Sequence, residues 1–186
     1  MKRIFDLFLS LLLLLIFSSP LLIIVFLIAC TSSGPVLYWS NRVGRNNVIF
    51  KMPKFRTMLV DTPEVATHLL NDSNKFLTPV GPFLRKSSLD ELPQLWSIIK
   101  GDMSFVGPRP ALFNQDCLIE LRTKSGVEVL LPGLTGWAQI NGRDELSVPE
   151  KVRLDVEYLQ QQSFFFDMKI VLLTFLKVIR RDGVMH

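Results

Sequence analysis

Cysteine and histidine are scarce in this sequence, which has two of each among its 186 residues. Cys30 and Cys117 lie far apart, so they offer no disulfide framework, and we expect reduced thiols. His68 and His186 are isolated, and no cluster of His and Cys has the spacing of a zinc site. The sequence therefore argues against a disulfide-rich secreted domain and against a zinc enzyme.

Several common motifs of nucleotide and acyl chemistry are also missing. The chain contains no GxxxxGK[ST] phosphate loop, no GxGxxG fingerprint and no GxSxG elbow. These absences argue against a P-loop nucleoside triphosphatase, a Rossmann enzyme and a hydrolase built on a nucleophile elbow. The net charge is only +4, which argues against a protein that binds nucleic acid through bulk charge.

Acidic residues are missing from one region, residues 34–60, although that region is rich in basic ones. It follows directly on an apolar segment, so its charges would meet anionic lipid headgroups or a phosphorylated substrate. The basic residues are Arg42, Arg45, Lys51, Lys54 and Arg56.

The chain does have one long apolar run, from Ile4 to Cys30, with Asp6 as its only acid. A run of about 18 or more apolar residues is a candidate membrane helix. A cleaved signal peptide is the less favoured interpretation, because its apolar region is usually about 7–15 residues long. We therefore predict a membrane segment over residues 1–34.

This segment contains "SSP" near its middle, where Pro20 follows Ser18 and Ser19. Proline removes a helical hydrogen bond and clashes with the preceding turn, so we expect a bend there. A serine hydroxyl could satisfy a carbonyl that the bend sets free. The hinge is therefore predicted at Ser19 and Pro20.

Basic residues flank the apolar run on both sides, with Lys2 and Arg3 before it and Arg42 and Arg45 after it. Basic flanks favour the cytoplasmic side of a membrane. Because both flanks favour the same side, a re-entrant helix that enters and leaves through one leaflet is preferred over a kinked spanning helix.

The rest of the chain, residues 35–186, reads as a single cytoplasmic domain that forms one integrated unit with the membrane helix. The expected fold class is α+β and mostly helical, with surface amphipathic helices. The glycine-rich stretches 101–111 and 126–146 are predicted to be irregular. The predicted elements are a short β-hairpin over 35–55, helices over 63–70 and 148–162, and one or two helices over 81–101 closed by Gly101. An apolar helix with basic residues is predicted over 164–181. This last helix either lies on a membrane surface or packs as an ordinary helix.

Two acids stand side by side in "RKSSLDELPQLW", Asp90 and Glu91. Ser88 and Glu91 have the spacing of a capping box, so a helix start alone could explain them. A carboxylate at a helix N-terminus is also kept ionised, as a carboxylate nucleophile requires. Two carboxylates suit Mg²⁺, which commonly combines one or two of them with substrate phosphates.

Arginine and lysine residues elsewhere supply candidate phosphate contacts. Arg109 lies between two prolines in "GPRP", so little conformational entropy is lost when it binds a phosphate; a rigid turn with a solvated arginine is the alternative. Each of the remaining basic candidates could equally be a solvated surface charge. They are Lys54, Arg56, Arg85, Lys86 and Arg143.

Taken together, these motifs resemble a known family. The order is a basic start, an apolar segment broken by "SSP", then "KFRTM", "SLDELPQLWSIIKGDMSFVGPRP", "PGLTGWAQINGR" and "FFFDMKI". This order is similar, over essentially the whole chain, to the small monotopic phosphoglycosyl transferases, a group of bacterial sugar transferases.

The resemblance implies an activity and its partners. Such enzymes move a sugar-1-phosphate from a UDP-sugar to polyprenyl phosphate, usually undecaprenyl phosphate, giving a polyprenyl-diphospho-sugar and UMP. This is the first membrane step in building surface glycans, at the cytoplasmic face of the bacterial inner membrane. Downstream glycosyltransferases are a further candidate partner, and no nucleic acid is expected.

The resemblance also implies roles for individual residues. Asp90 is the nucleophile that expels UMP and carries the phospho-sugar, and Glu91 assists in placing Mg²⁺ or in acid–base work. The family's re-entrant hinge matches Ser19 and Pro20. Asp167 matches a late acidic position but could instead pair with a neighbouring base. The cations expected to contact phosphate or nucleotide are Lys54, Arg85, Arg109 and Arg143.

Two other functions were weighed against this one. A membrane-anchored scaffold without catalysis would use the acid pair only as a helix cap. A polytopic transferase would need several membrane segments, whereas the sequence has one strong one.

Overall fold

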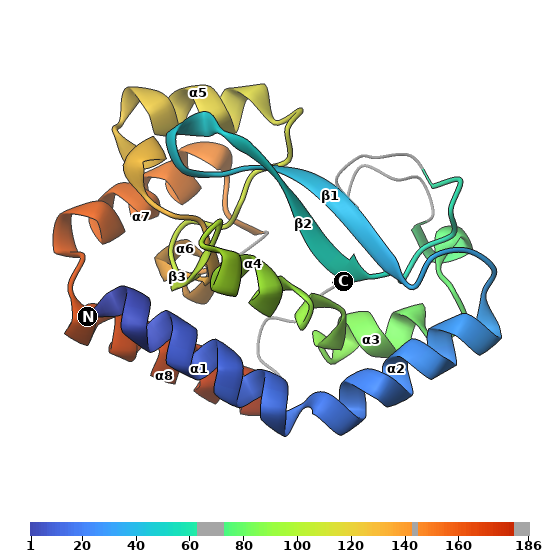
Figure 1. The fold of residues 1–186 in the computed structure, drawn as a ribbon. Coiled ribbons are helices and arrows are strands. Elements are labelled where there is room, and N and C mark those ends of the chain that lie inside the picture. Colours follow the sequence, from blue (N-terminus) through green and yellow to red (C-terminus); the bar gives the residue numbers. More distant parts are fainter. Residues whose placement is uncertain (63–72, 143–144, 181–186) are drawn as a thin grey trace.

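A computed structural model of the protein describes residues 1–62, 73–142 and 145–180 (Figure 1). The helix predicted over 63–70 and the candidate residue Arg143 lie outside these residues. The described part contains helices and two small two-stranded sheets, as the predicted α+β class requires.

The apolar N-terminal run forms two helices, α1 (Lys2–Ile16) and α2 (Ser18–Thr31), bent by 63° (Figure 1). Pro20 has no N–H to donate to the Ile16 carbonyl, and its ring would clash with that carbonyl, so α1 ends at Ile16. The Ser18 hydroxyl donates to the Leu15 carbonyl at 2.8 Å. The predicted bend is present, with its break at Phe17, just before Ser19 and Pro20.

Each of the two helices packs one side against the rest of the protein. Ile24 and Ile28 of α2 are buried against Phe55 and Leu84. The outer sides are apolar and exposed, including Phe8 of α1 and Phe26 of α2. Among the described residues, no single helix is long and apolar enough to cross a membrane, whereas the bent pair together meets that length and composition.

A β-hairpin forms as predicted, from β1 (Leu37–Val43) and β2 (Ile49–Phe55). The strands are antiparallel, with Tyr38 opposite Lys54 and Arg42 opposite Phe50. The turn, with the 3-10 turn η1 (Arg45–Asn47), places Asn46 at φ 53° and Asn47 at φ 59°, in the left-handed region that asparagine tolerates better than most residues.

The acid pair lies between two short helices, α3 (Gly81–Lys86) and α4 (Gln94–Lys100). Asp90 and Glu91 belong to a 3-10 turn, η4 (Leu89–Glu91). Gly101 closes α4 at φ +99°, as predicted for this glycine. A further 3-10 turn, η3 (Ser73–Phe76), precedes α3.

The two glycine-rich stretches, predicted to be irregular, contain short regular elements. β3 (Ser104–Val106) pairs in parallel with β4 (Gly133–Thr135). A Cβ at Gly107 would clash with the Leu131 carbonyl, so glycine permits this close approach of two backbones. The second stretch also contains η5 (Val127–Val129) and α6 (Trp137–Ile140).

Three longer helices complete the fold. The sequence analysis missed α5 (Asp116–Lys124) and predicted α7 (Val148–Gln161) and α8 (Phe164–Arg180). Residues from α4, β3, α7 and α8 share the main core, which includes Ile98, Phe105, Tyr158 and Ile170. The N-terminal part of α8 lies beside that of α1, where the rings of Phe5 and Phe164 are 5.7 Å apart (Figure 1).

Candidate active site

The acid pair owes its position to an unusual turn. Ser88 adopts φ 55°, in the left-handed region, and η4 follows at once. The Ser88 side chain makes no capping hydrogen bond, and the Glu91 carboxylate binds cations instead. The predicted capping box is therefore wrong here; the chain has one at Ser147 and Glu150, at the start of α7.

Glu91 joins two segments that are distant in the sequence. Its Oε1 accepts from Lys54 Nζ of β2 at 2.8 Å and from Arg109 Nη2 at 2.9 Å. Burial alone would raise the pKa of Glu91, but Arg109 and Lys54 together outweigh it and hold the pKa well below its usual value. Glu91 is thus a link between the hairpin and the GPRP loop that stays charged at neutral pH.

Asp90 has the opposite electrostatic setting. It is 8% exposed, and burial raises its pKa above the usual value, although Lys54 opposes the rise. Its other charged neighbours are Glu91, Arg85 and Arg109. We predicted that a helix N-terminus keeps Asp90 ionised; instead Asp90 precedes α4, and burial makes it more basic than an ordinary aspartate.

The four cations predicted to contact phosphate, and the further basic candidate Arg56, differ in where the structure places them. Lys54, Arg85 and Arg109 all lie near the acid pair, in agreement with the predicted grouping. Arg143 lies outside the described residues. Arg56 points elsewhere: its guanidinium donates to Ser32 Oγ at 2.8 Å and to the Ser32 carbonyl at 2.9 Å, which ties the end of α2 to the end of the hairpin.

Arg42, predicted only as part of the basic region and as a flank of the apolar run, is also a neighbour of the site. Its guanidinium donates to the Pro110 carbonyl at 3.1 Å and to Ser40 Oγ at 3.0 Å. Burial, together with the charge of Arg109, lowers its pKa to about 10, while Glu91 opposes the change. The register of the hairpin places Arg42 on the same face as Lys54, so strand alternation could have identified it.

The backbone of the GPRP loop is held by a second pair that was also missed. Arg122 Nη1 donates to the Arg109 carbonyl at 2.8 Å. The same guanidinium donates twice to Asp155 Oδ2, at 2.9 and 2.7 Å, and Asp155 is 1% exposed. The Gly133 amide donates to the Pro108 carbonyl at 2.8 Å. Arg109 is therefore fixed through its backbone as well as through its side chain.

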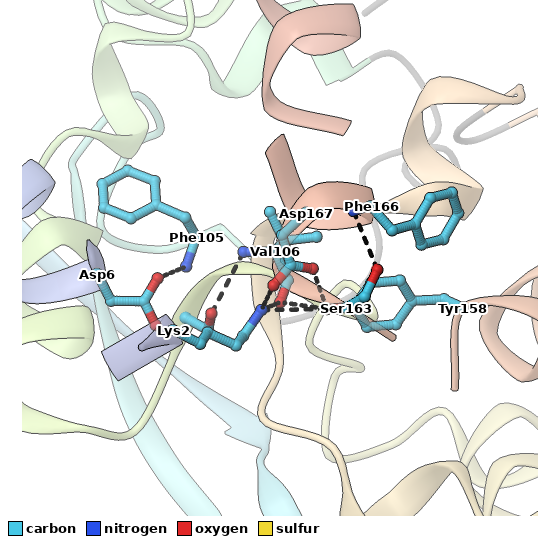
Figure 2. Close-up of polar contacts among 9 residues, drawn as sticks. Lys2, Asp6, Phe105, Val106, Tyr158, Ser163, Phe166 and Asp167 are labelled. Atoms are coloured by element: carbon cyan, nitrogen blue, oxygen red, sulfur yellow. Dashed lines mark hydrogen bonds and ion pairs between the residues drawn. The ribbon is translucent and has the colours of Figure 1, made fainter. Parts of the chain in front are cut away.

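Asp167 lies in a different polar cluster (Figure 2). Its Oδ2 accepts from Lys2 Nζ at 2.6 Å, and its Oδ1 accepts from the Tyr158 hydroxyl at 2.6 Å. It is 3% exposed. This arrangement matches the alternative that Asp167 pairs with a base, here a lysine at the start of α1.

Within residues 1–62, 73–142 and 145–180, Asp90 and Glu91 are the carboxylates beside these cations that could hold a metal ion. Among the described residues, no group of three or more His, Cys, Asp or Glu side chains could hold a metal on its own. Two carboxylates fit Mg²⁺ when substrate phosphates supply further oxygens. Since both cations contact Glu91 through Oε1, the Oε2 atom and the Asp90 carboxylate are the oxygens that would hold the ion.

Residues 1–181 match the family model described as "Bacterial sugar transferase". This chain belongs to the bacterial sugar transferase family. The membership confirms the predicted resemblance and the predicted enzyme class, a sugar-phosphate transferase.

Individual relatives of this family cover nearly all of the chain. The "Uncharacterized sugar transferase EpsL" of Bacillus subtilis is 41% identical over 184 residues, 99% of this chain and 90% of that protein. The "Undecaprenyl-phosphate galactose phosphotransferase" of Salmonella typhimurium is 37% identical over 98% of this chain and 41% of its own length. The "UDP-glucose:undecaprenyl-phosphate glucose-1-phosphate transferase" of Escherichia coli is 41% identical over 95% and 40%. The chain thus spans less than half of the two longer bacterial sugar transferases.

Proposed function

We propose that this protein transfers a sugar-1-phosphate from a UDP-sugar to undecaprenyl phosphate, at the cytoplasmic face of the bacterial inner membrane. The names of its relatives support undecaprenyl phosphate as the acceptor. The observation that carries the proposal is the site itself: a buried carboxylate, Asp90, next to an excess of cations. Such a site suits two anionic substrates, because their charge must be neutralised before a carboxylate can approach phosphorus.

The reaction has two displacements at one phosphorus atom. An oxygen of the ionised Asp90 carboxylate attacks the phosphorus that bears the sugar, and the P–O bond to UMP breaks with its electron pair leaving on UMP. A phosphate oxygen of the lipid then attacks the same phosphorus and releases Asp90. Because burial raises the pKa of Asp90, its carboxylate is a better nucleophile than an ordinary one.

Other residues of the chain bind and orient the substrates. Arg109 and Lys54 are fixed by Glu91, so they offer their charge to the diphosphate with little loss of entropy. Asp90 and Glu91 would hold Mg²⁺, which supplies Lewis-acid neutralisation of the phosphates when bound. The acid pair does not cap a helix, so the observation that favoured a catalytically inert scaffold no longer applies.

The apolar outer surface supports the proposed membrane position. Exposed apolar side chains cover the outer sides of α1 and α2 and continue onto α8, where Phe165 is 85% exposed. A re-entrant α1–α2 pair would bury these side chains in one leaflet and keep both flanks cytoplasmic. The lipid phosphate and the active site would then lie at a similar depth.

The test is release of UMP by the purified full chain in detergent, with undecaprenyl phosphate, Mg²⁺ and a panel of UDP-sugars. We expect release with at least one donor sugar. Without the acceptor, intact-mass measurement should show a phospho-sugar adduct on the wild-type protein but not on Asp90→Asn. Absence of UMP release across the whole panel would refute the proposed activity, and near-normal turnover by Asp90→Asn would refute its nucleophile.

A further inference from the structure

Three charged residues at the start of α1 bind other parts of the protein: Lys2, Arg3 and Asp6. Lys2 and Asp6 are one helical turn apart and so share a side of the helix. Asp6 is 2% exposed, whereas Ile4 and Phe8, on other sides, are largely exposed. Burying a carboxylate in an apolar helix costs free energy unless the carboxylate is hydrogen-bonded, so Asp6 requires hydrogen-bond donors from the rest of the protein.

The Lys2 ammonium has as many acceptors within the protein as it has N–H donors (Figure 2). Its ammonium has three donors, and it reaches three acceptors: Asp167 Oδ2 at 2.6 Å, the Val106 carbonyl at 2.9 Å and the Tyr158 hydroxyl at 3.1 Å. Tyr158 in turn donates to Asp167. Lys2 thus joins α1 to α7, α8 and the last residue of β3, and its N–H donors are engaged within the protein instead of by a lipid headgroup.

Asp6 and Arg3 bind the same stretch of chain, residues 98–106. Asp6 Oδ1 accepts from the Phe105 amide at 3.1 Å, next to the carbonyl that Lys2 holds (Figure 2). The Arg3 guanidinium donates to the Ile98 carbonyl and, at 2.7 Å, to the Ile99 carbonyl, at the end of α4. Carbonyls at a helix C-terminus lack helical partners and favour a cation.

These contacts fall on segment 98–106, between the two halves of the active site. Upstream, α4 follows directly on the turn that holds Asp90 and Glu91. Downstream, Val106 is three residues from Arg109, which binds Glu91. We propose that Lys2, Arg3 and Asp6 form a latch that positions segment 98–106 and thereby directs Arg109 toward Glu91. The latch rests on the proposed function, because it acts by placing groups for that transfer.

The latch makes α1 a positioning element of the active site as well as a membrane segment. The alternative is that Lys2 and Arg3 only set the orientation of α1 in the membrane, as basic flanks do. The two differ in outcome: loss of the latch lowers turnover in protein that is still membrane-bound, whereas loss of an orientation signal changes the topology.

The test uses the full chain in lipid nanodiscs, with Lys2→Met and the matched control Lys124→Met. Lys124 forms an exposed ion pair with Glu120, away from the acid pair. We expect Lys2→Met to lower kcat for UMP release by about 10- to 100-fold, as displacement by about 1 Å can do. The KM for the UDP-sugar should change little, and Lys124→Met should match the wild type. The double variant Lys2→Met/Asp167→Asn should lower kcat by less than the product of the two single effects, because both substitutions remove the Lys2–Asp167 contact.

Hydrogen exchange separates positioning from general destabilisation. In Lys2→Met we expect faster exchange of the amides of residues 103–107 and 109, with the rest of the domain unchanged. Wild-type kcat in Lys2→Met, or exchange raised evenly over the chain, would overturn the latch. So would a raised KM in Asp167→Asn alone, which would assign Asp167 to the substrate. If the wild type releases no UMP from any donor, the proposed function is wrong, and the exchange measurement still tests the latch.

Discussion

Arg109 Nη2 lies 2.9 Å from Glu91 Oε1, the same oxygen that Lys54 contacts. One carboxylate oxygen therefore holds a strand residue and a loop residue in a fixed relation beside Asp90. This arrangement divides the carboxylate oxygens by task, since Glu91 Oε1 is committed to structure, whereas Glu91 Oε2 and the Asp90 carboxylate remain for metal binding and chemistry. The division has consequences for stability and for pH dependence.

Glu91→Gln should destabilise the protein. The change leaves Lys54 and Arg109 without their shared anion in a poorly solvated place, which typically costs about 3 kcal/mol in the free energy of unfolding. Urea unfolding in detergent measures this cost. The matched control is Glu120→Gln, which removes the fully exposed partner of Lys124 and should leave the unfolding midpoint unchanged. Equal midpoints for both variants would contradict the structural role of Glu91.

Glu91 should also make stability depend on pH. Its pKa in the folded protein is well below the usual value, so its contribution is fully present above the ordinary glutamate pKa. The contribution is lost as pH falls through the lowered folded pKa. The unfolding midpoint of the wild type should therefore fall more steeply on acidification than that of Glu91→Gln. Parallel midpoint curves would contradict this.

Asp90→Asn should abolish transfer and stabilise the fold. Burial raises the pKa of Asp90, so its ionisation destabilises the folded protein as pH rises through that pKa. Removing the charge should raise the free energy of unfolding at pH 7 by about 0.5–2 kcal/mol, the usual gain from a single stabilising substitution. Thermal unfolding combined with UMP release measures both effects.

The same pKa predicts the acid limb of the pH–rate profile. The nucleophile must be ionised, so kcat/KM should fall on acidification at a pH above that of an ordinary aspartate. Glu120→Gln should keep the profile of the wild type. If the acid limb of the profile instead lay at the pKa of an ordinary aspartate, substrate or metal binding, and not burial, would set the charge of Asp90.

Arg122→Met should lower turnover, although Arg122 is not expected to contact the substrate. Its guanidinium holds the Arg109 carbonyl and pairs with buried Asp155. We expect kcat to fall by about 10-fold or more, with a loss of stability of about 3 kcal/mol from the unpaired Asp155. Arg122→Met/Asp155→Asn should recover stability but not kcat. Recovery of both would show that Arg122 acts only through stability.

Pro20→Ala tests the bent helix pair. Alanine restores the N–H that Pro20 cannot offer to the Ile16 carbonyl, so α1 and α2 can join into one straight helix. A straight helix of this length can span the bilayer. Labels at residues 2 and 45 should both be cytoplasmic in the wild type and lie on opposite sides in Pro20→Ala. Leu22→Ala, at an exposed position of α2, should keep the wild-type labelling.

The elements with strong local signals were predicted from the sequence. The bend before Pro20, the hairpin around "GRNN" and the stop of α4 at Gly101 each depend on residues within one turn of the feature. The family and the enzyme class were also predicted, because the motifs run along the whole chain.

Features set by distant contacts could not be predicted. Glu91 looked like a helix cap because Ser88 has the right spacing, yet two cations from other segments compete more strongly for its carboxylate. The strands β3 and β4 have three residues each, too few for an alternating pattern, and depend on the close approach of Gly107 to Gly133. The missed helix α5 is short and has no capping side chain.

The polar side of α1 also has a consequence for biosynthesis. Lys2 is translated 104 residues before Val106 and 165 residues before Asp167, its partners in the finished protein. α1 and α2 therefore leave the ribosome, and can reach the membrane, while the groups that will receive Lys2 and Asp6 do not yet exist. Contacts between segments so far apart form late in folding. Lys2 cannot contact Asp167 until α8 has been made, so the proposed latch can close only after nearly the whole domain has been synthesised.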